Sequence, residues 1–100
     1  MPETTWIPQD VGGHGRLDTA EKHSLPDSSF AFPISRKEPM TDAQHVRNAI
    51  GRFDQIEDVS DAEREVAFAN IQTAARYYGI DMRETDWRQL GFRPRSRRAQ

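Results

Sequence analysis

The chain has 100 residues, which leaves room for one small domain. Its apolar fraction of 35 % lies below the ~45–50 % typical of globular proteins. The 14 basic and 16 acidic side chains give a net charge of −2, which argues against a wholly basic nucleic-acid coat. The absence of cysteine excludes disulfides, thiolate nucleophiles and cysteine-based zinc sites.

Neither a membrane helix nor a secretory signal is visible in the sequence. No apolar run approaches the ~18 residues that a membrane span needs. The first residues show no basic region followed by an apolar one. We therefore expect a protein that does not bind membranes and is located in the cytoplasm or inside a virion, of which the cytoplasm is our prediction.

Residues 1–24 are expected to be a disordered N-terminal tail. They are rich in glycine and small polar residues, and their apolar residues are too scattered to form one face. Such a segment buries too little apolar surface to offset the entropy of ordering it. Trp6 and Ile7 could dock on the domain or on a partner, but we expect Trp6 to be incidental.

Residues 25–34 are predicted to form an extended arm. Phe30, Phe32 and Ile34 alternate with smaller residues, which is the period of a strand. Pro33 lacks an amide donor, so the segment is expected at an edge and not inside a sheet. Two phenylalanines this close together in a polar chain indicate that the arm packs on the rest of the domain.

Residues 41–54 are predicted to begin the helical part of the domain. Thr41 is the expected N-cap. Apolar residues then recur at the spacing of one helix face, at Val46, Ile50 and Phe53.

A second, longer helix is predicted to run to Tyr78. Ser60 and Glu63 have the spacing of a capping box, the strongest local signal in the chain. Gly79 followed by Ile80 has the pattern of a Schellman helix stop. Thr85 is then expected to cap a short helix over residues 86–90.

These elements predict a mainly α fold: an antiparallel helical hairpin plus a short C-terminal helix, covered by the extended N-terminal arm. The helical domain spans residues 25–91, and residues 92–100 form a basic flexible tail. Without the arm, the helices would bury too little surface to be stable. The predicted core consists of Phe30, Phe32, Ile34, Val46, Ile50, Phe53, Phe68, Ile71, Ala75, Tyr78, Trp87 and Leu90.

No catalytic or metal-binding pattern is present. The three histidines lack the spacing of a zinc site, and no serine lies in a nucleophile motif. We therefore expect a non-enzymatic protein with no metal and no cofactor.

The order of short motifs resembles a small family of uncharacterised bacterial and phage proteins. The resemblance rests on the segments at 25–33, 36–39 and 42–53, and continues to about residue 90. Similar segments accompany phage capsid-maturation proteins, and the resemblance supplies no catalytic residue. It implies a partner surface of polar residues on the first helix, namely His45, Arg47, Asn48 and Arg52. Alternatively, His45 and Asn48 hydrogen-bond the backbone of the arm.

The sequence thus predicts a protein–protein interaction module, in a phage-derived or regulatory context. The alternative is a nucleic-acid-associated accessory protein, whose basic tail neutralises phosphates. The tail residues that would do so are Arg93, Arg95, Arg97 and Arg98, which lie in a stretch without acids.

Overall fold

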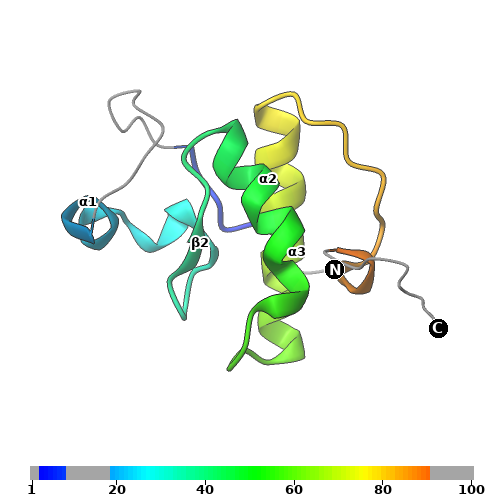
Figure 1. Ribbon diagram of the computed structural model, residues 1–100, viewed down its shortest axis with the longest axis horizontal. Helices are drawn as coiled ribbons and strands as arrows, with labels where there is room; N and C mark the ends of the chain where they lie inside the picture. The colour runs from blue at the N-terminus through cyan, green and yellow to red at the C-terminus, as the bar shows by residue number, and fades with distance from the viewer. Residues whose placement is uncertain (1–2, 9–18, 91–100) are drawn as a thin grey trace.

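The computed structural model describes residues 3–8 and 19–90 (Figure 1). This part of the chain forms α1 (Thr19–Ser24), β1 (Phe30–Phe32), β2 (Lys37–Pro39), α2 (Ala43–Arg52) and α3 (Asp61–Tyr77). Short 3-10 turns occupy Asp27–Ser29, Phe53–Gln55 and Trp87–Gln89. Strands β1 and β2 pair antiparallel, with Phe30 opposite Pro39 and Phe32 opposite Lys37. The protein is therefore a small mixed α/β domain.

The prediction of a mainly α fold, an antiparallel helical hairpin covered by an extended arm, is wrong. The chain reverses after β1, and β2 pairs with the expected arm to make a β-hairpin. Two residues there, Arg36 (φ 54°) and Glu38 (φ 58°), adopt the left-handed conformation. Glycine and asparagine are the residues that usually adopt this conformation, so an arginine in the turn and a glutamate in β2 gave no signal for the hairpin.

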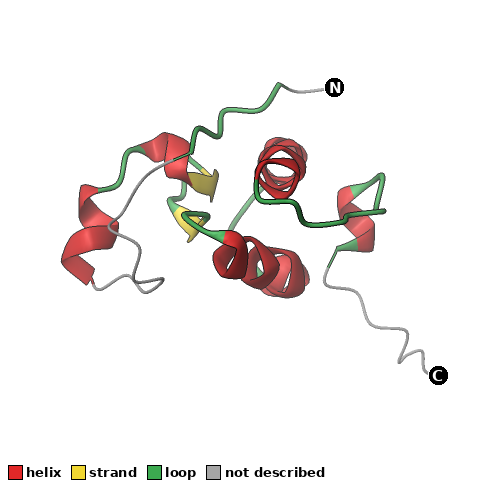
Figure 2. Ribbon diagram, turned by 90° about the horizontal axis from the view of Figure 1, so that it is seen from above, coloured by secondary structure: helices red, strands yellow, loops and turns green. Residues whose placement is uncertain are grey.

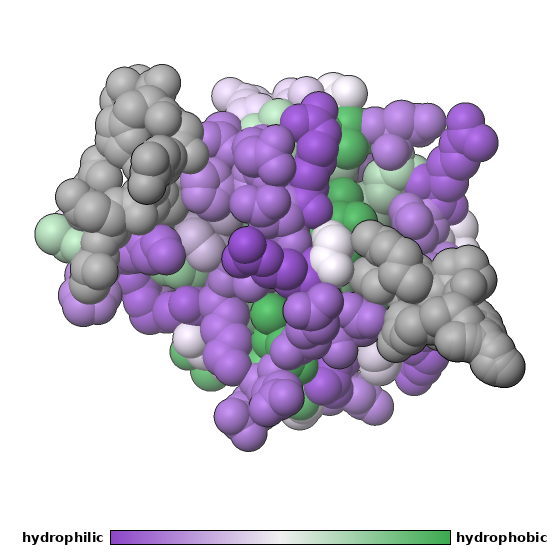
Figure 3. Space-filling model, viewed as in Figure 1, coloured by the Kyte–Doolittle hydropathy of each residue, from purple (hydrophilic) through white to green (hydrophobic). Residues whose placement is uncertain are grey.

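The core lies where the β-hairpin packs against α2 and α3, which lie side by side (Figures 1 and 2). The rings of Phe32 and Phe53 have centroids 5.5 Å apart. Ala67 and Ala74 on α3 are fully buried, and such small side chains allow the close approach of β1. The face shown in Figure 3 is mostly hydrophilic, with small hydrophobic patches.

Most of the predicted core is buried, but Ile34 is not. Its side chain is 84 % exposed. The turn begins at Pro33, so the alternation of β1 ends before residue 34. The buried members of the predicted core are Phe30, Phe32, Val46, Phe53, Phe68, Ile71, Ala75 and Leu90, and the partly buried members are Ile50, Tyr78 and Trp87.

The N-terminal segment joins the core, which differs from the expected disordered tail with an incidental tryptophan. Trp6 is only 4 % exposed, and its Nε1 donates a hydrogen bond to the carbonyl of Met40 at 3.1 Å. Residues 19–24 form α1. The rest of that predicted tail, at 1–2 and 9–18, and the predicted basic tail lie outside the described residues.

The predicted ends of the long helix are confirmed. The hydroxyl of Ser60 accepts from the amide of Glu63 at 3.1 Å, and the carboxylate of Glu63 accepts from the amide of Ser60 at 2.9 Å. At the other end, Gly79 has a φ of 74°. The amide of Ile80 then reaches back to the carbonyl of Ala75 at 2.8 Å, which is the Schellman bond.

The two other predicted caps are each displaced by one residue. Asp42, not Thr41, caps α2 by accepting from the amide of His45 at 2.8 Å. Asp86, not Thr85, caps the 3-10 turn that carries Trp87. In both cases a carboxylate beside a threonine takes the cap, because aspartate is the better acceptor there.

Candidate ligand-binding pocket

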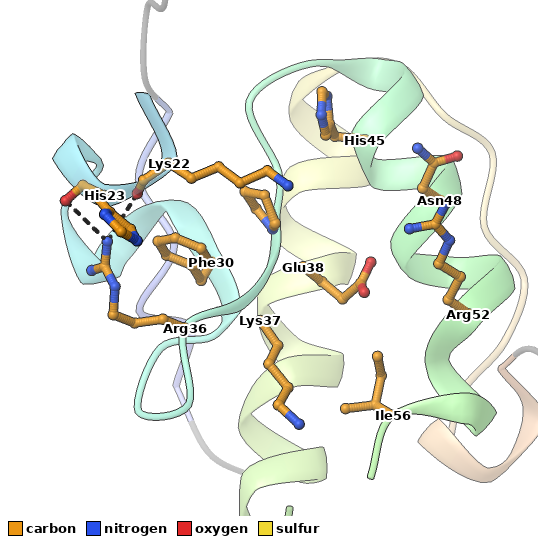
Figure 4. A pocket seen from close by; sticks show the side chains of 11 residues that line it. Lys22, His23, Phe30, Arg36, Lys37, Glu38, His45, Asn48, Arg52 and Ile56 are labelled. Carbon is orange, nitrogen blue, oxygen red and sulfur yellow. Dashed lines mark hydrogen bonds between the residues drawn. The ribbon is translucent and has the colours of Figure 1, made fainter. Parts of the chain in front are cut away.

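A pocket of about 560 Å³ lies between α1, the β-hairpin and α2 (Figure 4). This volume falls in the ~300–1,000 Å³ range of ligand-binding pockets. Its lining contains one acidic side chain, that of Glu38, among many basic ones. The lining residues are Lys22, His23, Phe30, Arg36, Lys37, Glu38, Pro39, His45, Asn48, Arg52 and Ile56.

Arg36 builds one wall of this pocket. Its guanidinium pairs with Asp27 at 2.6 Å and donates to the carbonyls of Lys22 at 3.0 Å and Leu25 at 2.9 Å. The same group lies 4.6 Å from the centroid of the Phe30 ring. These contacts tie the end of α1 to the β-hairpin, so Arg36 is engaged within the fold.

Two further basic groups of the lining also have partners. The Nζ of Lys37 donates to the carbonyl of Glu57 at 2.6 Å. His45 Nδ1 lies 2.8 Å from Asp42 Oδ1. Burial is the largest single influence on the pKa of Asp42 and acts to raise it, but the hydrogen bonds from His45 outweigh it and the pKa is lowered.

Lys22 and Arg52 face the pocket from opposite sides, from α1 and from α2 (Figure 4). Both side chains are exposed, and neither forms a hydrogen bond or an ion pair with another described residue. Asn48 lies one helical turn before Arg52 on the same face of α2, and its Oδ1 accepts from Gln44 at 3.1 Å. The positive charges of Lys22 and Arg52, which face the same pocket, attract anions.

Glu38 lies in the middle of this basic lining. Its carboxylate is half-buried and points toward Asn48 and Arg52 (Figure 4). Burial raises the pKa of Glu38, although the charges of Arg52, His45 and Lys22 act to lower it. No described residue hydrogen-bonds this carboxylate.

The structure brings part of the predicted partner surface together. His45, Asn48 and Arg52 line the pocket, whereas Arg47 is exposed outside its lining. The alternative that His45 and Asn48 bond the arm is wrong, because their partners are Asp42 and Gln44.

Lys22, Lys37 and Glu38 were missed by the sequence analysis. Lys22 belongs to a segment expected to be disordered, and the other two belong to a strand that was not predicted. No local sequence signal places these residues beside the first predicted helix.

Within residues 3–8 and 19–90, no group of three or more histidine, aspartate or glutamate side chains could hold a metal ion. No helix in this part of the chain is both long enough and apolar enough to cross a membrane.

The sequence of residues 13–85 matches a family described as a family of unknown function, DUF6582. Neither a curated protein nor a solved structure matches the chain. The match confirms the resemblance to an uncharacterised family, and the bacterial and phage connection stays a prediction.

Proposed function

The chain belongs to the DUF6582 family of unknown function, and we propose that it is a non-enzymatic protein–protein interaction module. Its pocket binds an acidic side chain of the partner protein. The observation that carries this proposal is the pair Lys22 and Arg52, which face one pocket from two helices. The side chains of both form no hydrogen bond or ion pair with another described residue, although the carboxylate of Glu38 lies in the same pocket.

The frame of the pocket supports the binding of a carboxylate. Arg36 anchors α1, which carries Lys22, to the β-hairpin, and α2, which carries Arg52, packs against β2 of the same hairpin. Both helices are therefore held in place before a ligand arrives. A preformed site loses less entropy on binding than a mobile one. Hydrogen bonds between ionised groups are about twice as strong as those between neutral groups, which suits a carboxylate to these two cations.

The lining also supports a role in binding over one in catalysis. His45 is paired with Asp42 as a catalytic base would be. However, the lining contains no serine, threonine or cysteine that such a base could activate. An acidic ligand would therefore be bound and released unchanged.

The remaining functional predictions stay predictions. The nucleic-acid alternative rests on Arg93, Arg95, Arg97 and Arg98, which lie outside the described residues. A phage-derived context and a cytoplasmic location are likewise part of the proposal.

The test uses a fluorescein-labelled peptide in which four glutamates are separated by glycine and serine. Fluorescence anisotropy compares wild type with Arg52→Glu and with the matched control Arg47→Glu, on the same helix but outside the pocket. We expect Arg52→Glu to weaken binding about tenfold and Arg47→Glu less than twofold, because Arg52 lines the pocket and Arg47 does not. Equal losses in both variants, or no binding by wild type, would refute the proposal.

A further inference from the structure

Glu38 has a backbone conformation that its own residue type disfavours. It lies in the middle of β2 with a φ of 58°. Left-handed backbone is unfavourable for any residue with a Cβ, and glycine would adopt it without this cost. Strain of this kind is concentrated at functional sites, where the side chain serves a purpose other than folding.

Among residues 3–8 and 19–90, none donates a hydrogen bond to the carboxylate of Glu38. The charged, titratable and polar groups that line the same pocket are Lys22 and His23 from α1, Arg36 and Lys37 from the hairpin, and His45, Asn48 and Arg52 from α2. None of them hydrogen-bonds the carboxylate. A half-buried carboxylate in this state has lost part of its hydration with no replacement, which is unfavourable. A ligand that brings its own donor would remove that penalty.

Building on the proposed function, we propose that Glu38 makes the pocket specific for a partner segment in which a basic residue adjoins the acidic one. The acidic side chain contacts Lys22 and Arg52, and the ammonium or guanidinium of the basic residue donates to Glu38. The pocket volume of about 560 Å³ leaves room for two neighbouring side chains. A purely acidic segment also contacts Lys22 and Arg52, but Glu38 repels it, because like charges at close range oppose binding.

The experiment compares two labelled peptides of equal length and equal glutamate content. In the acidic peptide, each glutamate is followed by serine, and in the mixed peptide it is followed by lysine. Binding to wild type, Glu38→Gln and Glu38→Gly is measured by anisotropy at one ionic strength. Glu38→Gln removes the charge and keeps the backbone strain, whereas Glu38→Gly removes both.

We expect wild type to bind the mixed peptide about fivefold more tightly than the acidic one, which is the scale of one partly exposed ion pair. Glu38→Gln should weaken binding of the mixed peptide and strengthen binding of the acidic peptide, each about fivefold. Glu38→Gly should show the same altered preference while unfolding at the same temperature as wild type or higher, because the strain is relieved.

The outcomes separate this inference from the proposed function. If the acidic peptide binds wild type through Arg52 and Glu38→Gln leaves both affinities unchanged, the role of Glu38 is overturned and the binding function stands. A gain for the acidic peptide without a loss for the mixed one makes Glu38 only a counter-ion of Arg52, which also overturns the inference. If neither peptide binds wild type, both proposals fail.

Discussion

Replacing Asn70 by leucine tests whether one buried side chain holds the N-terminal segment on the core. Asn70 is fully buried on α3. Its Oδ1 accepts from the amides of Thr5 at 2.6 Å and Trp6 at 3.1 Å, and from the hydroxyl of Thr4 at 2.7 Å. Its Nδ2 donates to the carbonyl of Ala31 at 2.9 Å. Leucine has nearly the same size, so the substitution removes the hydrogen bonds and leaves little cavity.

The decrease in the free energy of unfolding depends on the polar groups that Asn70→Leu leaves without a hydrogen-bond partner. The carbonyl of buried Ala31 loses the hydrogen bond that Asn70 donates. The amides of Thr5 and Trp6 lose their acceptor on Asn70, and of the two only the Trp6 amide keeps another acceptor among the described residues, the hydroxyl of Thr4 at 3.2 Å. Each buried unsatisfied group costs about 1–3 kcal/mol, but Thr5 is exposed and regains water. We therefore expect Asn70→Leu to lower the free energy of unfolding by about 2–4 kcal/mol, a large part of the ~5–15 kcal/mol of a typical domain.

Urea unfolding followed by circular dichroism measures this change. Gln72→Leu, on the same helix and half-exposed, is the control and should stay within about 0.5 kcal/mol of wild type. In a Trp87→Phe background, Trp6 is the remaining tryptophan, and its emission should shift to the red when the segment detaches. Equal stability of Asn70→Leu and wild type, or unchanged Trp6 emission, would show that Asn70 does not hold this segment.

Two further predictions concern the β-hairpin and the cap of α2. Phe32→Ala should lower the free energy of unfolding by about 3–5 kcal/mol, because its ring is 1 % exposed. Ile34→Ala, at 84 % exposed, should change it by less than about 0.5 kcal/mol, and similar losses in urea unfolding would contradict this placement. The lowered pKa of Asp42 means that its contribution to stability is present above the unfolded-state pKa of ~3.9 and is lost as pH falls through the folded-state value. Asp42→Asn keeps a side chain that can cap the helix but removes the group that titrates. The melting temperature of this variant should therefore fall less steeply below about pH 4 than that of wild type. An equal slope for both proteins would exclude this role of Asp42.

The candidate pocket was predictable only on its α2 side. His45, Asn48 and Arg52 are three and four residues apart, so the helical period alone puts them on one face. Arg47 was grouped with these residues because it is polar. It follows His45 by two residues, however, and a step of two residues along a helix places a side chain close to the opposite side. The other side of the pocket comes from Lys22 and the hairpin, and its assembly depends on contacts between segments distant in sequence.

Local sequence patterns were enough to predict where the long helix begins and ends. Ser60 and Gly79 act through hydrogen bonds to residues a few positions away, so their patterns predict structure without the rest of the chain.

Three features depend on how distant parts of the chain pack together: the pairing of the arm into a β-hairpin, the burial of Trp6 in the core and the position of Glu38 in a basic pocket. Trp6 is held by Asn70, 64 residues away in sequence. Glu38 keeps its left-handed backbone although its side chain disfavours it. These features depend on burial and on hydrogen bonds between distant segments, whose combined free energy overrides the local preference of each residue.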